Sequence, residues 1–156
     1  MPSAAQLHIT DERPYSMTSF YVSPSSLTYK QYATLISVGK SFGWIAPYVW
    51  ARESFYPDAH LKSSVLKKAV RAISKSDIFV GRVPGTYSTC IEIGMAYTLC
   101  EEVLITARDP VHYTQTSLAD AYVAALPNIR RVCCEIDEIP AVLEQEYLNL
   151  ISPKVR

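Results

Sequence analysis

The 156-residue chain predicts a single three-layer α/β domain in which helices cover both faces of a parallel sheet. Patterns typical of strands and of helices alternate along the chain, the links between them are short, and no internal repeat interrupts the order. Alternating β and α units joined by right-handed crossovers produce a parallel sheet with helices on both faces. The hydrophobic content of 49% is enough to form the core of one domain of this length.

Short apolar runs bounded by turn residues predict the strands. Pro47 makes the second run a short or edge strand, because proline cannot donate to a strand ladder. A sheet of five parallel strands favours a flavodoxin-like (Rossmann-like) domain with strand order 2-1-3-4-5. The expected strands are Thr18–Ser23, Trp44–Val49, Ile78–Val83, Val103–Ala107 and Ile129–Cys134.

Apolar residues at helical spacing predict the helices between these strands. We expect the domain to span residues 18–152, preceded by a polar, proline-containing tail at residues 1–17. The expected helices are Tyr32–Phe42, His60 to about Lys75, Ile91–Leu99, Leu118–Ala125 and Ile139–Leu150.

Charge and cysteine patterns exclude several classes of function. Fifteen basic and fifteen acidic side chains cancel, so no overall field attracts nucleic acid or an anionic membrane. The sequence has no apolar run of membrane-spanning length and no signal-peptide pattern, which indicates a cytoplasmic protein. The four cysteines show no metal-ligand spacing, so we expect free thiols and neither a metal nor another cofactor. A small-molecule ligand fits these properties best.

The predicted strand order also predicts where a ligand binds. In such sheets the crevice lies beyond the carboxyl ends of the first and third strands, where the winding direction reverses. The loop Pro24-Ser25-Ser26 follows the first strand, and the loop Pro84–Thr89 follows the third and leads into a helix that carries Glu92. These two loops are the expected walls of the site.

The segment Ser76–Tyr97 (SDIFVGRVPGTYSTCIEIGMAY) is the sharpest motif. A buried strand is followed by a loop of small residues and then by Glu92-Ile-Gly94-Met-Ala96. This pattern resembles the nucleoside 2-deoxyribosyltransferase superfamily. Three further stretches, Phe20–Pro24, Arg52–Phe55 and Arg108-Asp109, are most similar to the CMP and hydroxymethyl-CMP hydrolases and to the deoxynucleoside 5′-monophosphate N-glycosidases.

The resemblance implies a site and a ligand. It implies that Glu92 attacks or shields the anomeric carbon of a nucleoside or nucleotide, and that Tyr21 helps to position Glu92. It also implies self-association as a homodimer or a larger homo-oligomer that shares active sites. The residues predicted to bind substrate are Ser23, Pro24, Ser25, Ser26, Arg52, Glu53, Gly85, Ser88 and Thr89. For Arg52 and Glu53, an exposed ion pair on a loop is the competing and more ordinary role.

Elementary chemistry supports a carboxylate at this place. Breaking an N-glycosidic bond builds positive charge on the ribose, which a nearby carboxylate stabilises or captures as an ester. Ser88 and Thr89 at a helix N-terminus could bind a phosphate or a ribose hydroxyl. The competing interpretation is a capping box, because Thr89-x-x-Glu92 has the spacing of a helix cap that performs no chemistry. The strand-turn-helix context favours catalysis.

The remaining candidates are interpreted as structural. Asp77 is expected at the amino end of a strand, away from the site, and Cys90 as a small packing residue. The aromatic residues Trp44, Trp50 and Phe55 could stack on a base, but packing is the ordinary role of such side chains.

The chain also departs from the family pattern. Relatives carry an aspartate on the helix before the third strand, where this chain has residues 68–71 (KAVR), and transferases often carry one at the position of Thr86. A general acid is therefore unassigned, with Glu53 or a residue of a neighbouring subunit as the candidates.

These observations favour hydrolysis of a nucleoside 5′-monophosphate to a free base and a sugar phosphate. Base exchange between deoxynucleosides and NAD cleavage are the alternative enzymatic functions. A non-catalytic nucleotide-binding module is the alternative from a different class.

Overall fold

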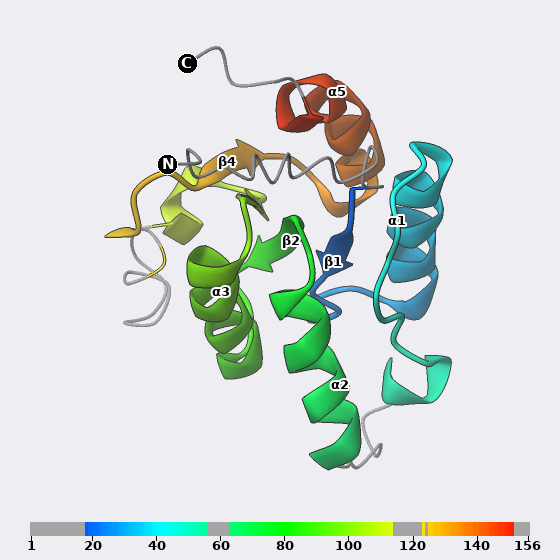
Figure 1. The fold of residues 1–156 in the computed structure, drawn as a ribbon. Coiled ribbons are helices and arrows are strands. Elements are labelled where there is room, and N and C mark those ends of the chain that lie inside the picture. Colours follow the sequence, from blue (N-terminus) through cyan, green and yellow to red (C-terminus); the bar gives the residue numbers. More distant parts are fainter. Residues whose placement is uncertain (1–17, 56–62, 114–122, 124, 152–156) are drawn as a thin grey trace, which may run out of the picture.

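The computed structural model describes residues 18–55, 63–113, 123 and 125–151. Within these residues, four parallel strands form one sheet in the order β1-β2-β3-β4 (Figure 1). The predicted tail and most of the predicted helix at residues 118–125 lie outside the described residues, and the domain boundaries 18–152 stay a prediction. The strands are β1 (Phe20–Val22), β2 (Ile78–Val83), β3 (Glu102–Ala107) and β4 (Arg130–Cys133).

Helices cover both faces of this sheet. Helices α1 and α5 pack against each other, and α2 packs against α3 (Figure 1). Neighbouring residues of β1 point to opposite faces, because the Phe20 ring lies against Gly39 of α1 while Tyr21 reaches Glu92 of α3. The three-layer α/β prediction is therefore confirmed. The helices are α1 (Tyr29–Ser41), α2 (Ser63–Ser74), α3 (Tyr87–Leu99) and α5 (Ile139–Ile151), with short 3-10 helices η1 (Arg52–Phe55), η2 (Pro110–Tyr113) and η3 (Ile136–Glu138).

The five-strand order 2-1-3-4-5 is not formed in the described part of the chain. The segment expected as the second strand makes a single parallel bridge, between Ile45 and Ser19. Phe20 N donates to Ile45 O at 2.8 Å, on the edge of β1 that faces away from β2. Pro47 follows two residues later and has no N–H to extend the ladder. The segment thus lies where the second strand of the predicted order belongs, without becoming a strand.

The core lies on both faces of the sheet. Every residue of β2 is buried, which is typical of a central parallel strand covered on both sides. Fully burying one large apolar side chain contributes roughly 1.5–3 kcal/mol to folding. The largest fully buried apolar side chains include Phe20, Phe79, Ile73, Leu104, Ile105 and Leu143.

Asp77 lies just before β2, at the amino end of the sheet. Its Oδ2 accepts hydrogen bonds from Ser19 N and Ser19 Oγ, both at 2.9 Å. These bonds join the starts of β1 and β2. The structural role predicted for Asp77 is confirmed.

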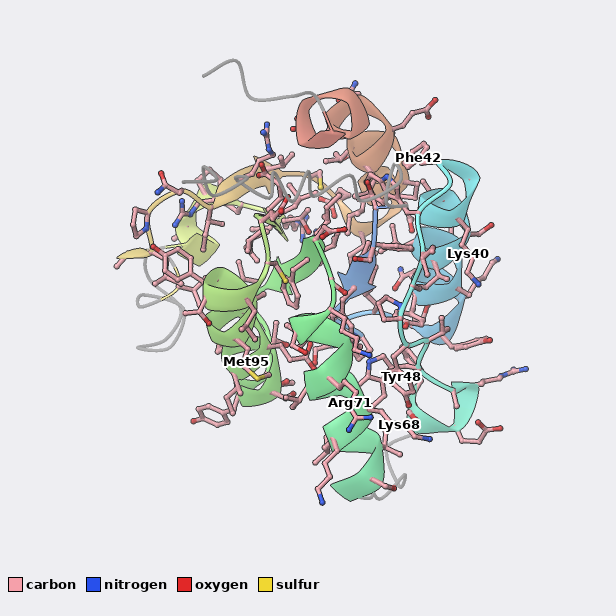
Figure 2. The ribbon with its side chains drawn as sticks, in the orientation of Figure 1. Lys40, Phe42, Tyr48, Lys68, Arg71 and Met95 are labelled. Atoms are coloured by element: carbon pink, nitrogen blue, oxygen red, sulfur yellow. The ribbon has the colours of Figure 1, made fainter. Side chains whose placement is uncertain are left out.

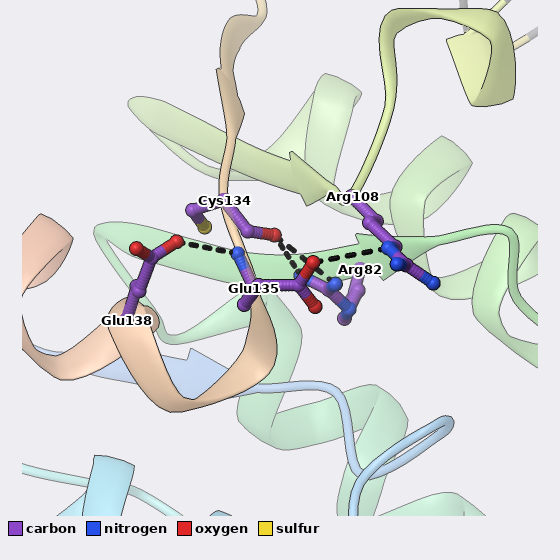
Figure 3. A network of polar contacts seen from close by, with 5 residues as sticks. All are labelled: Arg82, Arg108, Cys134, Glu135 and Glu138. Atoms are coloured by element: carbon purple, nitrogen blue, oxygen red, sulfur yellow. Dashed lines mark hydrogen bonds and ion pairs between the residues drawn. The ribbon is translucent and has the colours of Figure 1, made fainter.

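A polar network lies at the carboxyl ends of β2, β3 and β4 (Figure 3). The buried Arg82 of β2 donates from both terminal nitrogens to Cys134 O at 3.1 Å, and Arg108 Nε lies 3.0 Å from Glu135 Oε1. Glu138 Oε2 accepts from Glu135 N at 2.7 Å and caps η3. The buried Arg82 thus links the carboxyl ends of β2 and β4, whereas the exposed Arg108–Glu135 pair contributes little.

Candidate active site

The loops after β1 and β2 touch each other at the carboxyl edge of the sheet. Ser25 Oγ lies 3.3 Å from Thr86 Oγ1, and Ser26 Oγ donates to Pro84 O at 3.2 Å. The two walls predicted from the topology are therefore side by side. Between β1 and β2 the chain passes along the other edge of β1, where Ile45 bridges Ser19, and this change of direction is what marks a switch point in such sheets.

Helix α3 begins at Tyr87, four residues before the start predicted from its apolar spacing. Thr86 is its N-cap, so Thr89 is the third helical residue and Glu92 the sixth. The capping-box interpretation is therefore wrong, because Glu92 lies beyond the turn whose free N–H groups need caps. The exposed Tyr87 and Ser88 concealed this start, since they lie outside the apolar pattern.

Glu92 meets Tyr21 across the space between α3 and β1. The Tyr21 hydroxyl donates to Glu92 Oε1 at 3.3 Å, and the indole Nε1 of Trp50 donates to the same hydroxyl at 2.9 Å. Tyr21 is 1% exposed, and its ring stacks on Phe79 with centroids 5.8 Å apart. The structure thus brings together the two residues expected to be catalytic.

The other oxygen of the carboxyl group has no partner. Glu92 Oε2 is buried and accepts no hydrogen bond from any residue in the described part of the chain. Ser23 Oγ is likewise buried without a hydrogen bond of good geometry to a described residue, although it lies close enough to Glu92 to favour the charged form of that carboxyl group. A buried carboxylate oxygen without a donor is costly, so such a group is more often functional than structural.

Burial controls the acidity of this pair. Removal of Glu92 from water raises its pKa to about 7, although the nearby Ser23 and Tyr21 hydroxyls favour the charged form. Burial, followed by the charge of Glu92, raises the pKa of Tyr21 far above its usual value. Tyr21 therefore stays a neutral donor at all physiological pH values, while Glu92 changes charge close to neutrality.

A cavity of about 240 Å³ opens in front of Glu92. Three serine hydroxyls, two aromatic rings and several aliphatic groups surround it, and Glu92 is the one ionisable group among the described residues of its lining. A pocket with many apolar groups and few polar ones is typical of small-molecule sites. The lining residues are Pro24, Ser25, Leu27, Trp50, Ser54, Phe55, Leu66, Ser88 and Glu92.

A second cavity, of about 270 Å³, lies between α1 and the start of α5. Lys30 and Asp137 at its rim are both exposed, and Leu35 is the fully buried residue in its lining. Glu92 does not line it. Chemistry by the buried carboxyl group can therefore take place at the first cavity and not at the second.

The cavity contains part of the set of residues predicted to bind substrate. Pro24, Ser25 and Ser88 line it directly, and Ser23 lies behind it beside Glu92. Ser88 and Glu92 are four residues apart on α3 and so share one face of the helix.

Gly85 and Thr89 do not line the cavity and contact each other instead. A Cβ on Gly85 would lie 2.6 Å from Thr89 Oγ1, so the glycine lets the loop approach the helix. Ser26 likewise uses its hydroxyl within the loops, on Pro84 O. These residues shape the site without lining it.

Arg52 and Glu53 are exposed and lie outside the lining of the cavity. The Arg52 guanidinium lies over the Tyr29 ring, 5.8 Å from its centroid. Their neighbours Ser54 and Phe55 line the cavity instead. One turn of 3-10 helix sends residues 52 and 53 to solvent and residues 54 and 55 inward, a rotation that the irregular sequence did not reveal.

The sequence pattern identifies neither Trp50 nor Leu66 as a residue of the site. Trp50 was interpreted as packing, and it does pack, but its N–H groups also hydrogen-bond the tyrosines beside the site. Leu66 lies on α2 and is 45% exposed while it lines the cavity. Leu66 is an apolar residue on the mostly polar face of α2, and this exception in the pattern could have marked it as a site residue.

The described residues of α2 supply no carboxylate to the site. The segment that carries an aspartate in relatives has Lys68 and Arg71 here, both exposed (Figure 2). Over the described residues, no cluster of three His, Cys, Asp or Glu side chains could hold a metal ion, and no helix is long and apolar enough to cross a membrane.

The fold and the site define a three-layer α/β protein with a buried glutamate at the carboxyl edge of a parallel sheet. No family model matches the chain, and no curated protein matches it. Among solved structures, it is similar to the CMP N-glycosidase BcmB of Clostridium botulinum, with a TM-score of 0.55 and 16% identity over 81% of this chain and 99% of that chain. The chain therefore has the fold of a CMP N-glycosidase, and the resemblance seen in the Glu92 segment is confirmed at the level of the fold.

Proposed function

We propose that the protein hydrolyses the N-glycosidic bond of a nucleoside 5′-monophosphate, with Glu92 as the catalytic carboxylate. One observation carries the proposal: Glu92 borders the cavity with one oxygen held by Tyr21 and the other without a partner. A capping or packing role gives no reason for a buried carboxylate oxygen without a hydrogen-bond donor in a residue that lines a cavity. The fold shared with a CMP N-glycosidase agrees with this chemistry.

The carboxylate acts where positive charge develops. As the bond between the anomeric carbon and the base nitrogen lengthens, its electron pair leaves with the base and the ribose becomes cationic. The Glu92 carboxylate either stabilises this cation or bonds to it as an ester. Water then attacks the anomeric carbon and breaks any C–O bond to Glu92; its hydroxyl ends on the sugar phosphate and its proton neutralises the departing base. The surroundings of Glu92 are poorly hydrated, which strengthens the attraction between the carboxylate and the cation.

The other groups at the cavity suit the remaining parts of such a substrate. Ser25, Thr86 and Ser88 place hydroxyls beside the N-terminus of α3, where free N–H groups attract a phosphate. Trp50 and Phe55 provide an aromatic wall against which a base can stack. We assign phosphate binding to the first group and base binding to the second.

Self-association belongs to the same proposal. Large apolar side chains are exposed on α2 and α3, two helices that pack against each other. Leu66 belongs both to this set and to the cavity lining, so a second copy on these helices would help to close the site. Exposed apolar sets of this kind mark interaction surfaces. The residues are Leu66, Val70, Tyr87, Ile91 and Leu99.

The test is release of free base from a panel of nucleosides, ribo- and deoxyribonucleotides and NAD, followed by chromatography. Glu92→Gln should lower the rate about 10²–10⁴-fold, because the amide cannot balance the cationic sugar. Glu144→Gln on α5 alters an exposed carboxylate and should leave the rate unchanged. Equal rates for Glu92→Gln and wild type would refute the assignment of Glu92.

The same panel separates the alternative functions. A base exchanged onto an added deoxynucleoside would show transfer, and released nicotinamide would show NAD cleavage. Nucleotide binding measured by calorimetry, with no product from any substrate, would show a non-catalytic module.

A further inference from the structure

Trp50 uses both of its N–H groups inside the protein. Its indole Nε1 donates to the Tyr21 hydroxyl and its backbone N donates to the Tyr32 hydroxyl, each at 2.9 Å. The side chain is 4% exposed, and the Tyr48 ring packs on it with centroids 5.5 Å apart. Trp50 is therefore fixed by strand β1, helix α1 and its own loop.

The direction of these bonds has a chemical consequence. An indole N–H can only donate, so the Tyr21 oxygen must accept from Trp50. The single hydrogen of the Tyr21 hydroxyl is then left for its other neighbour, Glu92 Oε1, at 3.3 Å. A donor that is itself accepting a hydrogen bond is polarised and donates more strongly.

We propose that Trp50 is a positioning residue, which orients the Tyr21 hydroxyl toward Glu92 Oε1 and so holds the carboxylate with Oε2 free for the substrate. Its role in turnover rests on the proposed function, whereas the hydrogen-bond chain Trp50–Tyr21–Glu92 does not. Trp50 acts through Tyr21 and touches neither carboxylate oxygen by a hydrogen bond.

Few other described groups influence the charge of Glu92. Burial raises its pKa, and the hydroxyls of Tyr21 and Ser23 are the groups that lower it. From α1, Tyr32 faces the same charge, and burial raises the pKa of Tyr32 to about 12, so it stays neutral.

Helix α2 and the 3-10 helix η1 contribute no ionisable group to the cavity lining in the described part of the chain. Their contributions to that lining are Leu66, Ser54 and Phe55. The cations Lys68 and Arg71 of α2 are exposed (Figure 2). Loss of the Trp50 hydrogen bond should therefore be seen in the titration of Glu92 itself.

The experiment compares Trp50→Phe with wild type by carboxyl NMR titration and by kinetics. Weaker donation from Tyr21 should raise the pKa of Glu92 by about 0.5 pH units and lower kcat about threefold. Trp44→Phe is the matched control, because Trp44 is also 4% exposed but packs against Phe20 and Phe42 on another part of the sheet. It should change neither quantity.

The Tyr21→Phe background gives the decisive comparison. Without the phenol oxygen the indole has nothing to polarise, so adding Trp50→Phe should cause no further change in the pKa of Glu92. Replacing Trp50 by benzothienylalanine, which has sulfur in place of the N–H, tests the same bond with the shape retained if Trp50→Phe does not fold.

The outcomes separate the two proposals. An unchanged Glu92 titration in Trp50→Phe, or an equal shift in the Tyr21→Phe background, overturns the role of Trp50. If no nucleotide is cleaved, the proposed function fails, and the titration still decides whether Trp50 positions the pair.

Discussion

Replacing Glu92 by glutamine should stabilise the protein at alkaline pH. Burial raises the pKa of this carboxyl group from the ordinary 4.5 to about 7, so the native protein holds a proton that the unfolded chain has released. Each pH unit of difference corresponds to about 1.4 kcal/mol, giving about 3 kcal/mol in favour of the protonated native form. Glu92 lines an open cavity, and solvent screening reduces this to about 2 kcal/mol.

The sign follows from proton binding. Between pH 4.5 and pH 7 the native state binds more protons at Glu92 than the unfolded state, so the free energy of unfolding falls as the pH rises. Below pH 4.5 the group is protonated in both states, and well above pH 7 it is ionised in both. The destabilisation is therefore complete near pH 8 and mostly absent near pH 5.

Urea denaturation of wild type and Glu92→Gln at pH 5 and pH 8 measures this effect. The free energy of unfolding of the variant, minus that of wild type, should increase by about 2 kcal/mol from pH 5 to pH 8. Every other titrating group is common to both proteins and cancels in the difference. The exposed Glu144→Gln should show no such increase. A constant difference between the two pH values would show that Glu92 is not a desolvated carboxyl group.

Two further predictions concern the glycines near the site and the surface of α2. Gly85→Ala should lower the free energy of unfolding by about 1–3 kcal/mol, because its Cβ would lie 2.6 Å from Thr89 Oγ1. Gly94→Ala should instead raise the free energy of unfolding by about 0.5–1 kcal/mol in the same urea titration, because its Cβ would meet nothing within 4 Å. Val70→Glu should raise the dissociation constant of self-association about tenfold or more in sedimentation equilibrium. Ser37→Glu, on the exposed side of α1, is the control and should leave this constant unchanged. Equal dissociation constants for the two variants would rule out the surface of α2 as the interface.

The sequence predicted the central strand well, because most of its residues are apolar. Ile78–Val83 forms β2 with the predicted bounds, because a central parallel strand is buried on both faces and leaves a clear pattern. The predicted strand Trp44–Val49 does not form, because Pro47 in this short run stops the ladder after a single bridge. The early start of α3 could not be seen, because its first turn is exposed and carries no apolar period.

For the site, the sequence predicted where Glu92 and Tyr21 lie, but not which neighbouring side chains contact them or line the cavity. Glu92 and Tyr21 were expected near one crevice because the ends of neighbouring parallel strands meet. Which members of residues 50–55 face inward depends on the turn of a 3-10 helix, and hydrogen bonds from Trp50 depend on tertiary packing. Neither leaves a periodic pattern in the sequence.

The indole of Trp50 connects the cavity to the Tyr21–Glu92 pair. This side chain lines the cavity, and it also donates a hydrogen bond to the Tyr21 hydroxyl, which in turn donates to the Glu92 carboxyl group. A base that moves the indole when it binds would change the hydrogen bond from Trp50 to Tyr21 and, through Tyr21, the orientation of the Glu92 carboxyl group. A base that fits poorly would leave this carboxyl group less well oriented. Under the proposed function, selectivity between bases would appear in the rate of bond cleavage as well as in binding affinity.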